Sequence, residues 1–461
     1  MLKIFGGKDF IKKFFKVAFP VMIQSMMGFL VSLIDTVMVG ALSNEAVAGV
    51  YATNQITFFF MVTIGGVIAG AGVYIQQFYG AKKEDYITQS HRFKLIATLI
   101  YIALIMVLSF LFGPQIVKFY ARNDSNPDLI LEQARFYMPI IIVSFLPLGL
   151  TTAINSSMRE IGEAKKVLIS SSISVAVNII GNAIFIYAFH MGVKGVAFAT
   201  LISRFVELFI IIYLSEKHDF YKMKTIFKGF HIEGKLAKKI GIKSIPMYFN
   251  ELSWATAMIL ISFAYSYRPN IISSLAIINS ITNIFGFIFG GLGIGVSILV
   301  GAKLGEGNIE EAKQNQRYLL RIGIAISIIM GLIMIAFSPF IPKLFTEVPP
   351  AQQALATTLI QIYSAFLFVY SIAFTNYITL RTGGRSVLAF LIDGAFIWAF
   401  AVTSSLLLAK YTEVPAVYIY LIVQLVDLLK AIVGLPIVLK GVWAKNLTHE
   451  FDNKPVNVTT S

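Results

Sequence analysis

Twelve long apolar runs dominate this sequence, and each is long enough to cross a lipid bilayer. A helix of about 20 apolar residues spans the roughly 30 Å hydrocarbon core. Only 13% of the residues are charged, about half the fraction that is usual in soluble domains. Charged or Gly/Pro-rich breaks place the predicted spans at 14–40, 47–79, 95–113, 134–154, 167–190, 193–214, 241–266, 272–302, 318–345, 353–379, 387–409 and 414–439. The sequence therefore predicts an all-α polytopic membrane protein with twelve transmembrane helices.

The basic residues are unevenly distributed over the predicted loops. If the N-terminus is placed inside, most of the 38 Lys and Arg residues fall in the two terminal segments and in the loops after even-numbered spans. Apart from residues near the span ends, only Arg204 and Lys430 fall within predicted spans. By the positive-inside rule, this pattern predicts a protein of the cell membrane with both termini in the cytoplasm. It also explains the net charge of +14 without nucleic acid, so we expect no nucleic-acid partner.

The two halves of the chain resemble one unit used twice. Offsets of roughly 220 to 226 residues superpose Ala18-Phe-Pro20 on Ser244-Ile-Pro246, Arg159 on Arg381, and the ISRFVEL segment from Ile202 on IVQLVDL from Ile422. Units of six spans have the same topology, so they are related by pseudo-two-fold symmetry about an axis along the membrane normal, with a substrate cavity between them. The predicted organisation is an N-terminal six-helix lobe (1–214), a cytoplasmic linker (215–240), a C-terminal six-helix lobe (241–440) and a cytoplasmic tail (441–461).

The first predicted span carries one acid, Asp35, in its apolar outer half. A carboxylate inside the membrane costs about 2.5–3.5 kcal/mol on insertion scales, so it is retained mainly where it faces a cavity, a partner or a protein interior. Pro20, in the same span, removes a backbone hydrogen bond and favours a bend. We therefore expect Asp35 to be functional and Pro20 to bend the helix.

Three polar residues of the fifth and sixth spans are candidates to share a cavity with Asp35. Asn178 and Asn182 are four residues apart and lie on one helical face. We expect Thr200, in the sixth span, to approach the same point. A carboxylate, two amide oxygens and a hydroxyl suit Na⁺, whereas the carboxylate alone suits a proton. The alternative for the two Asn residues is interhelical hydrogen bonding.

Glu251 and Asp393 are the acidic candidates in the second half. Glu251 lies deep in the seventh span, and Asp393 lies nearer the cytoplasmic end of the eleventh, where we expect it to be solvated or paired with Arg381 or Arg385. Two further pairs are spaced three residues apart and are expected to bond internally as structural pairs, Arg204 with Glu207 and Asp427 with Lys430.

Other function classes find little support in the residues. The chain has no Cys, which excludes disulfides and thiolate metal sites. An intramembrane enzyme needs a catalytic set within spans, whereas the five His residues fall in predicted loops, tails or span ends. We therefore expect no enzyme activity and no cofactor.

Several of these motifs resemble the multidrug and toxic compound extrusion (MATE) transporters of the multidrug, oligosaccharidyl-lipid and polysaccharide exporter superfamily. The resemblance runs from about Phe15 to Leu439. It rests on Asp35-Thr-Val-Met-Val-Gly40, on Asn178 and Asn182, on the stretch from Gly192 to Thr200, and on Leu380-Arg-Thr-Gly-Gly384.

The resemblance implies two six-helix lobes arranged as a V, and export of organic cations and drugs in exchange for H⁺ or Na⁺. In some members a first-span acid, two fifth-span polar residues and a sixth-span Thr form a cation site, which here corresponds to Asp35, Asn178, Asn182 and Thr200. The seventh-span acid of other members corresponds to Glu251. This chain has Asn182 where some members have Asp, and no acid between Ala351 and Leu380 matches their tenth-span acid.

The sequence thus predicts a monomeric antiporter that is coupled to H⁺ or Na⁺, is surrounded by membrane lipid, and exports cationic or amphipathic small molecules by alternating access. The alternative is a flippase for lipid-linked oligosaccharide or polysaccharide from the same superfamily. Such proteins usually line their cavity with Arg and Lys for pyrophosphate, which argues for the exporter.

Overall fold

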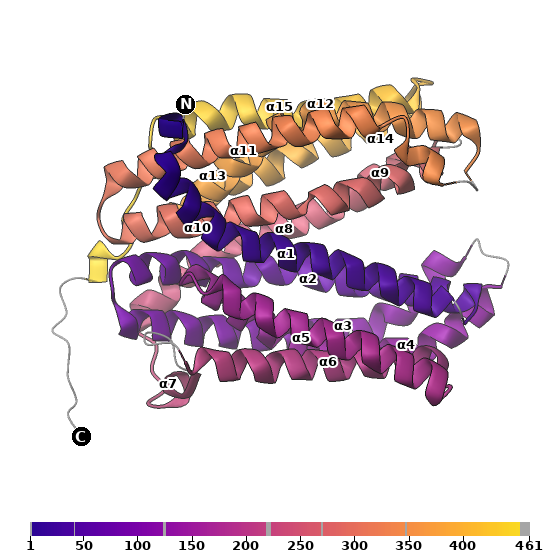
Figure 1. Ribbon diagram of the computed structural model, residues 1–461, viewed down its shortest axis with the longest axis horizontal. Coiled ribbons are helices and arrows are strands. Elements are labelled where there is room, and N and C mark those ends of the chain that lie inside the picture. The colour runs from indigo at the N-terminus through magenta and orange to yellow at the C-terminus, as the bar shows by residue number, and fades with distance from the viewer. Residues whose placement is uncertain are drawn as a thin grey trace.

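The computed structural model describes residues 2–40, 42–122, 126–217, 223–268, 271–345 and 348–451, and over these residues the regular structure is helical (Figure 1). The first half contains η1 (Leu2–Phe5), α1 (Gly7–Gly40), α2 (Asn44–Gly80), α3 (Glu84–Ala121), α4 (Pro127–Glu160), α5 (Ala164–Ala183), η2 (Ile184–Ala188) and α6 (Gly192–Ser215). The rest contains α7 (Met223–Phe227), α8 (Gly234–Tyr265), α9 (Ile271–Phe285), α10 (Phe287–Gly305), α11 (Ile309–Phe337), η3 (Ile341–Leu344), α12 (Pro350–Thr382), α13 (Ser386–Phe390), η4 (Leu391–Ala395), η5 (Ile397–Val402), α14 (Thr403–Tyr411), α15 (Ala416–Leu439) and η6 (His449–Phe451).

These helices form twelve transmembrane segments in two six-helix lobes. The eighth segment is divided into α9 and α10, and the eleventh runs from α13 through the π-helical segments η4 and η5 to α14. Among the described residues, ten helices are long and apolar enough to be candidate spans. The first helices of the two lobes, α1 and α8, are not among the ten. In α8 the polar pair Asn250 and Glu251 lowers the hydropathy.

The repeat of the sequence is visible in the turns. Gly162 and Gly384 have φ angles of 88° and 75° and close equivalent turns after α4 and α12. In each turn the glycine N–H donates to an arginine carbonyl three residues earlier, that of Arg159 or Arg381, across 2.9 Å. Glycine is favoured here because other residues avoid positive φ. Equivalent sequence positions therefore have the same backbone geometry in both lobes.

Helices α1 and α8 each cross between the lobes. Phe14, Ala18 and Met22 of α1 belong to a buried cluster with Leu292 and Val296 of α10. The later half of α1 packs against α5, where Gln24 bonds to Ser171 and Asp35 to Asn182. The crossing places one end of α1 against the C-terminal lobe and its acid against the N-terminal lobe. Pro20 lies within the first of these contacts, and α1 stays helical through it.

In α8 the exchange runs in the opposite direction. Leu236, Ile240 and Met247 join the buried cluster of the N-terminal lobe. Ala257 and Ile261 join the core of the C-terminal lobe. The first part of each lobe's first helix is therefore packed against the other lobe. The lobes as packed differ in this respect from the lobes predicted by chain order.

The lobes are closely packed at one end of the bundle, where η1, α7 and η6 lie; we refer to this as the terminal end (Figure 1). A Cβ at Gly80 would collide with the carbonyl group of Ala302, and one at Gly305 with that of Gln77. Small residues allow such close backbone approach between membrane helices. These glycines hold α2 and α10 together where both helices end.

The segment after α15 crosses from one lobe to the other at the terminal end. Trp443 is fully buried, and Phe451 is 5% exposed and in edge contact with Phe78 of α2 (ring centroids 5.6 Å). Gln77 Oε1 accepts a 2.8 Å hydrogen bond from the Leu447 N–H, and Lys239 of α8 forms an ion pair with Glu450. The segment therefore fastens the two lobes together.

Candidate functional site

The structure brings together the four residues proposed for the cation site of the N-terminal lobe. Asn182 donates from Nδ2 to Asp35 Oδ1 across 2.5 Å, and the same Nδ2 lies 3.5 Å from Asn178 Oδ1. Asn178 in turn donates from Nδ2 to Thr200 Oγ1 across 3.4 Å. Helices α1, α5 and α6 thus contribute one continuous chain of polar groups.

The chain has an unused acceptor at its centre. Asn182 is fully buried and Asn178 is 4% exposed. The Nδ2 atom of Asn182 is directed to Asp35, and its Oδ1 atom has no hydrogen-bond partner. A buried polar atom without a partner costs about 1–3 kcal/mol. The Asp35 and Asn178 oxygens both lie within 3.5 Å of the Asn182 Nδ2 atom. Carboxylate, amide and hydroxyl oxygens are ligands that a small cation takes, and the single carboxylate can alternatively take a proton.

In the C-terminal lobe, Glu251 on α8 is paired with a base on α12. Its Oε1 atom lies 3.5 Å from Arg381 Nη1 and accepts a 3.3 Å hydrogen bond from the Tyr377 hydroxyl. About a quarter of each charged side chain is exposed, 23% for Glu251 and 24% for Arg381. Glu251 therefore differs from Asp35, whose hydrogen-bond donor is a neutral amide.

The partner predicted for Asp393 is wrong. Asp393 forms an ion pair with Lys430 of α15, with Oδ1 and Nζ 2.9 Å apart, and accepts a 3.1 Å hydrogen bond from Asn250 Nδ2. Arg381 is instead paired with Glu251, and Arg385 donates from Nε to the Val442 carbonyl. This contact could not be predicted from sequence spacing, because Asp393 and Lys430 lie on different transmembrane segments. Glu251 and Asp393 therefore lie in separate, neighbouring ion pairs.

The two pairs expected from their spacing are both present. Arg204 Nη1 lies 3.4 Å from Glu207 Oε2. Lys430 Nζ lies 3.3 Å from Asp427 Oδ1. Lys430 therefore contacts two acids, one predicted and one not.

The assignment of Lys94 to a loop between two spans is wrong. This residue, assigned to a loop, is a fully buried part of α3 and is paired with Glu160 of α4 at 2.7 Å. His91 is also fully buried, with Nδ1 2.8 Å from Ser157 Oγ, although a loop was expected. Spacing along one helix could not reveal either residue, because both partners lie on α4.

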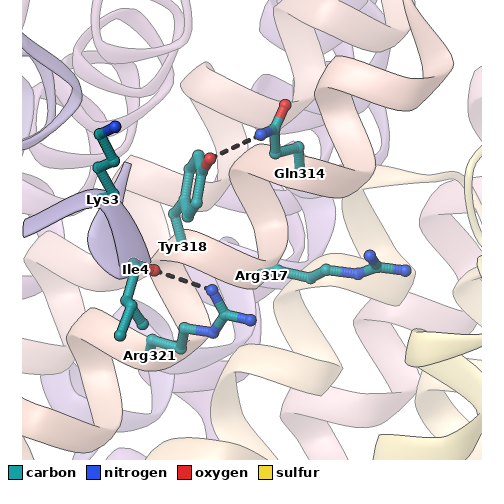
Figure 2. A pocket seen from close by; sticks show the side chains of 6 residues that line it. All are labelled: Lys3, Ile4, Gln314, Arg317, Tyr318 and Arg321. Carbon is teal, nitrogen blue, oxygen red and sulfur yellow. Dashed lines mark hydrogen bonds between the residues drawn. The ribbon is translucent and has the colours of Figure 1, made fainter. Parts of the chain in front are cut away.

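A separate cavity of about 360 Å³ lies at the terminal end between the N-terminal segment and α11 (Figure 2). Arg321 donates from Nη1 to the Ile4 carbonyl across 2.9 Å, and Gln314 donates to the Tyr318 hydroxyl. The lining residues come from η1 and α11 rather than from the helices that carry Asp35. The Arg321–Ile4 hydrogen bond in its wall joins the N-terminal segment to α11 of the C-terminal lobe. The cavity is distinct from the polar groups that run from Asp35 to Thr200.

Comparison with known proteins identifies relatives along most of the chain. The model of the family described as MatE matches residues 20–184 and again residues 246–404, so the two matches begin at Pro20 and Pro246. The probable multidrug resistance protein YoeA of Bacillus subtilis is 24% identical over 86% of both chains. The probable multidrug resistance protein NorM of Thermotoga maritima is 22% identical over 95% of both.

Solved structures agree with the arrangement of helices. A crystal structure of MATE in the bent conformation superposes with a TM-score of 0.84 at 20% identity, covering 96% of this chain and 99% of that one. The outward-facing conformation of a multidrug resistance MATE family transporter of the MOP superfamily gives a TM-score of 0.83 at 19% identity, covering 96% and 98%. At such identities the likeness establishes the fold alone.

Proposed function

This chain belongs to the MatE family of transporters, and on that premise we propose that it exports cationic or amphipathic small molecules in exchange for H⁺ or Na⁺. The family consists of transporters rather than enzymes, and the chain is a multi-pass membrane protein.

One observation carries the proposal, namely the chain of polar groups from Asp35 to Thr200. Asp35 is held by an amide rather than by a base, so its charge remains available to a cation. Among the described residues no base forms an ion pair with Asp35, and an unpaired intramembrane acid is expensive unless it has such a task. We assign the coupling ion to Asp35, Asn178, Asn182 and Thr200, with H⁺ or Na⁺ as a transported substrate and no resident cofactor.

The crossing of α1 provides a route from ion binding to lobe movement. Asp35 is in the part of α1 that packs on α5, and Pro20 is in the part that packs on α10. A cation that binds the outward-open form more tightly than the inward-open form shifts the equilibrium between them. In this proposal Pro20 allows α1 to bend as the lobes move, since proline removes a backbone hydrogen bond within the helix.

In the C-terminal lobe, Glu251 and Asp393 are proposed to respond to the same movement. Glu251 of α8 is paired with Arg381 of α12, and Asp393 of η4 is bonded to Asn250 of α8. The terminal end is proposed to face the cytoplasm in the cell membrane, in agreement with the distribution of Lys and Arg. We propose a monomer, with the division into lobes, linker and tail predicted from the sequence.

The flippase alternative is not favoured. A pyrophosphate-binding cavity needs free cations, whereas three of the interior bases, Lys94, Arg381 and Lys430, are each paired with a carboxylate. The relatives named above are described as multidrug resistance proteins.

The proposal is tested by efflux of ethidium from proteoliposomes under an imposed Na⁺ or H⁺ gradient. Asp35→Asn keeps the size of the side chain and should abolish gradient-driven efflux. Asp9→Asn is the matched control, because Asp9 is an exposed acid in the first turn of the same helix. Equal gradient-driven efflux by the wild type and Asp35→Asn would refute the coupling role.

A further inference from the structure

Three charged side chains meet inside the C-terminal lobe. Lys430 Nζ lies 2.9 Å from Asp393 Oδ1 and 3.3 Å from Asp427 Oδ1. Only 8% of the Lys430 side chain is exposed, against 22% for each acid. We refer to Asp393, Asp427 and Lys430 as the charge triad. One ammonium group faces two carboxylates, so the triad carries one negative charge in excess.

The surroundings of the charge triad do not balance this excess. The neighbouring base Arg381 is paired with Glu251. The hydroxyl groups of Tyr363 and Tyr370 on α12 are near enough to Asp427 to interact with it electrostatically, and both are neutral at physiological pH. Within the part of the chain that the structure describes, one carboxylate charge therefore lacks a cation of its own.

The equivalent layer of the N-terminal lobe is balanced. At the offsets of the sequence repeat, Ser171 corresponds to Asp393 and Glu207 to Asp427. Ser171 donates a 2.7 Å hydrogen bond to Glu207, whose charge is paired with Arg204. Because a hydroxyl group suffices at this place in one lobe, the second acid of the other lobe is not a requirement of the fold.

A buried acceptor without a partner lies beside the charge triad. Asn250 of α8 is 3% exposed and donates from Nδ2 to Asp393 Oδ2. Its Oδ1 atom is buried and has no hydrogen-bond partner. Asp35 and Asn182 repeat this arrangement with the roles of the helices exchanged, since the acid lies on the first helix of that lobe and the amide on the fifth. Asp393 also lies in the π-helical segment η4, and π-helical turns are frequent at functional sites.

We propose that the charge triad is a second site for one positive charge, in which the Lys430 ammonium group is a tethered competitor of the incoming cation. The entering group is a monovalent cation, either an inorganic ion or the cationic group of an exported compound. Its ligands are the carboxylates of Asp393 and Asp427 and the amide oxygen of Asn250. The inference rests on the proposed transport function and extends it to residues of α15.

The proposal predicts that cation affinity follows the net charge of the triad. The experiment measures the dissociation constants of Na⁺ and of tetraphenylphosphonium separately, at constant ionic strength, on the purified full chain. All variants contain Asp35→Asn, so that the N-terminal site does not contribute. The Na⁺ and tetraphenylphosphonium arms distinguish an inorganic ion from an organic one.

Four variants set the charge. Lys430→Gln makes the triad more negative and should tighten binding by about tenfold or more, whereas Asp427→Asn makes it neutral and should weaken binding by a similar factor. The double variant Asp427→Asn/Lys430→Gln restores the original net charge and should return within about threefold of the starting value. Asp393→Ser copies the balanced N-terminal layer and should bind weakly.

Lys303→Gln is the matched control. Lys303 also contacts two acids, Glu306 at 2.8 Å and Glu311 at 3.1 Å, but this group is solvent-exposed. Its replacement should leave both dissociation constants unchanged, because exposed pairs contribute little.

The proposal is overturned if Lys430→Gln binds both probes no more tightly than its parent, or if the double variant does not recover. If Lys430→Gln does not fold, the double variant and Asp393→Ser decide between the two outcomes, because neither adds to the excess charge. If coupled efflux is lost in Asp35→Asn while the dissociation constants measured here do not depend on the charge of the triad, the transport function stands and only the charge triad is rejected.

Discussion

Asn182 and Asp35 lie 147 positions apart in the chain and are joined by a 2.5 Å hydrogen bond from the amide Nδ2 to the carboxylate Oδ1. Asn182 is fully buried, and its Oδ1 atom has no partner. A neutral donor stabilises the carboxylate without cancelling its charge. Asp35 is therefore fixed in position and still able to attract a cation.

Asn182→Ala should weaken Na⁺ binding at Asp35, because it removes the unpartnered Asn182 Oδ1 atom as a ligand. The expected loss of affinity is roughly tenfold. Asn182→Asp should have the opposite effect on Na⁺, because a second carboxylate is added to the ligands. The Na⁺ dependence of ethidium efflux measures both, and a lower Na⁺ requirement in Asn182→Ala would contradict the assignment.

Gly80→Ala or Gly305→Ala should open the terminal end. Each added methyl group would meet the backbone of the other helix, at Ala302 or Gln77, and neither helix can yield without separating α2 from α10. Gly65→Ala on the same helix α2 is the control, because open space surrounds that position. Labelling of cysteines introduced at the terminal end should rise in the first two variants and not in the third. Unchanged labelling in all three would show that this contact does not close the terminal end.

Arg381→Gln should destabilise the protein more than Glu251→Gln/Arg381→Gln. Removal of the base leaves Glu251 as an uncompensated, largely buried charge, which costs about 2 kcal/mol after allowance for its partial exposure. Removal of both charges avoids this penalty. Unfolding midpoints in detergent compare the two variants, and a double variant less stable than Arg381→Gln would show that the pair is not the source of the effect.

Phe451→Ala should loosen the segment that crosses between the lobes. Phe451 is 5% exposed against α2, and truncation of a buried Phe costs about 3 kcal/mol. Phe340→Ala is the control, since Phe340 is 62% exposed. Limited proteolysis at the terminal end should accelerate in the first variant only, and equal rates would indicate that the crossing segment adds no stability.

Much of this fold could be predicted from the sequence because hydropathy and charge act locally. A run such as 193–214 must span the bilayer as a helix, since unpaired backbone groups cannot be left in lipid. The repeat was predicted from matching segments, and the turns at Gly162 and Gly384 have the same geometry. The neighbourhood of Asp35 was predicted because Asn178 and Asn182 share one helical face.

Contacts between distant helices could not be read in this way. The pairing of Lys94 with Glu160 and of Lys430 with Asp393 depends on which helices are adjacent. The sequence assigned Lys94 to a loop because it precedes the most apolar part of α3. The exchange of α1 and α8 between the lobes was hidden for a similar reason, since chain order alone assigns each helix to one lobe.

The central claim is that cation occupancy of Asp35 determines which end of the molecule opens. The chain has no Cys, so spin labels can be placed at Leu129 on α4 and Tyr411 on α14, which are 48% and 70% exposed at the end opposite the terminal end. Double electron–electron resonance then measures the distance between the lobes with and without Na⁺, and at low and high pH. The account predicts that a cation shifts the wild type and Asp9→Asn toward the longer distance, and that Asp35→Asn loses most of this response. An equal shift in Asp35→Asn would contradict it.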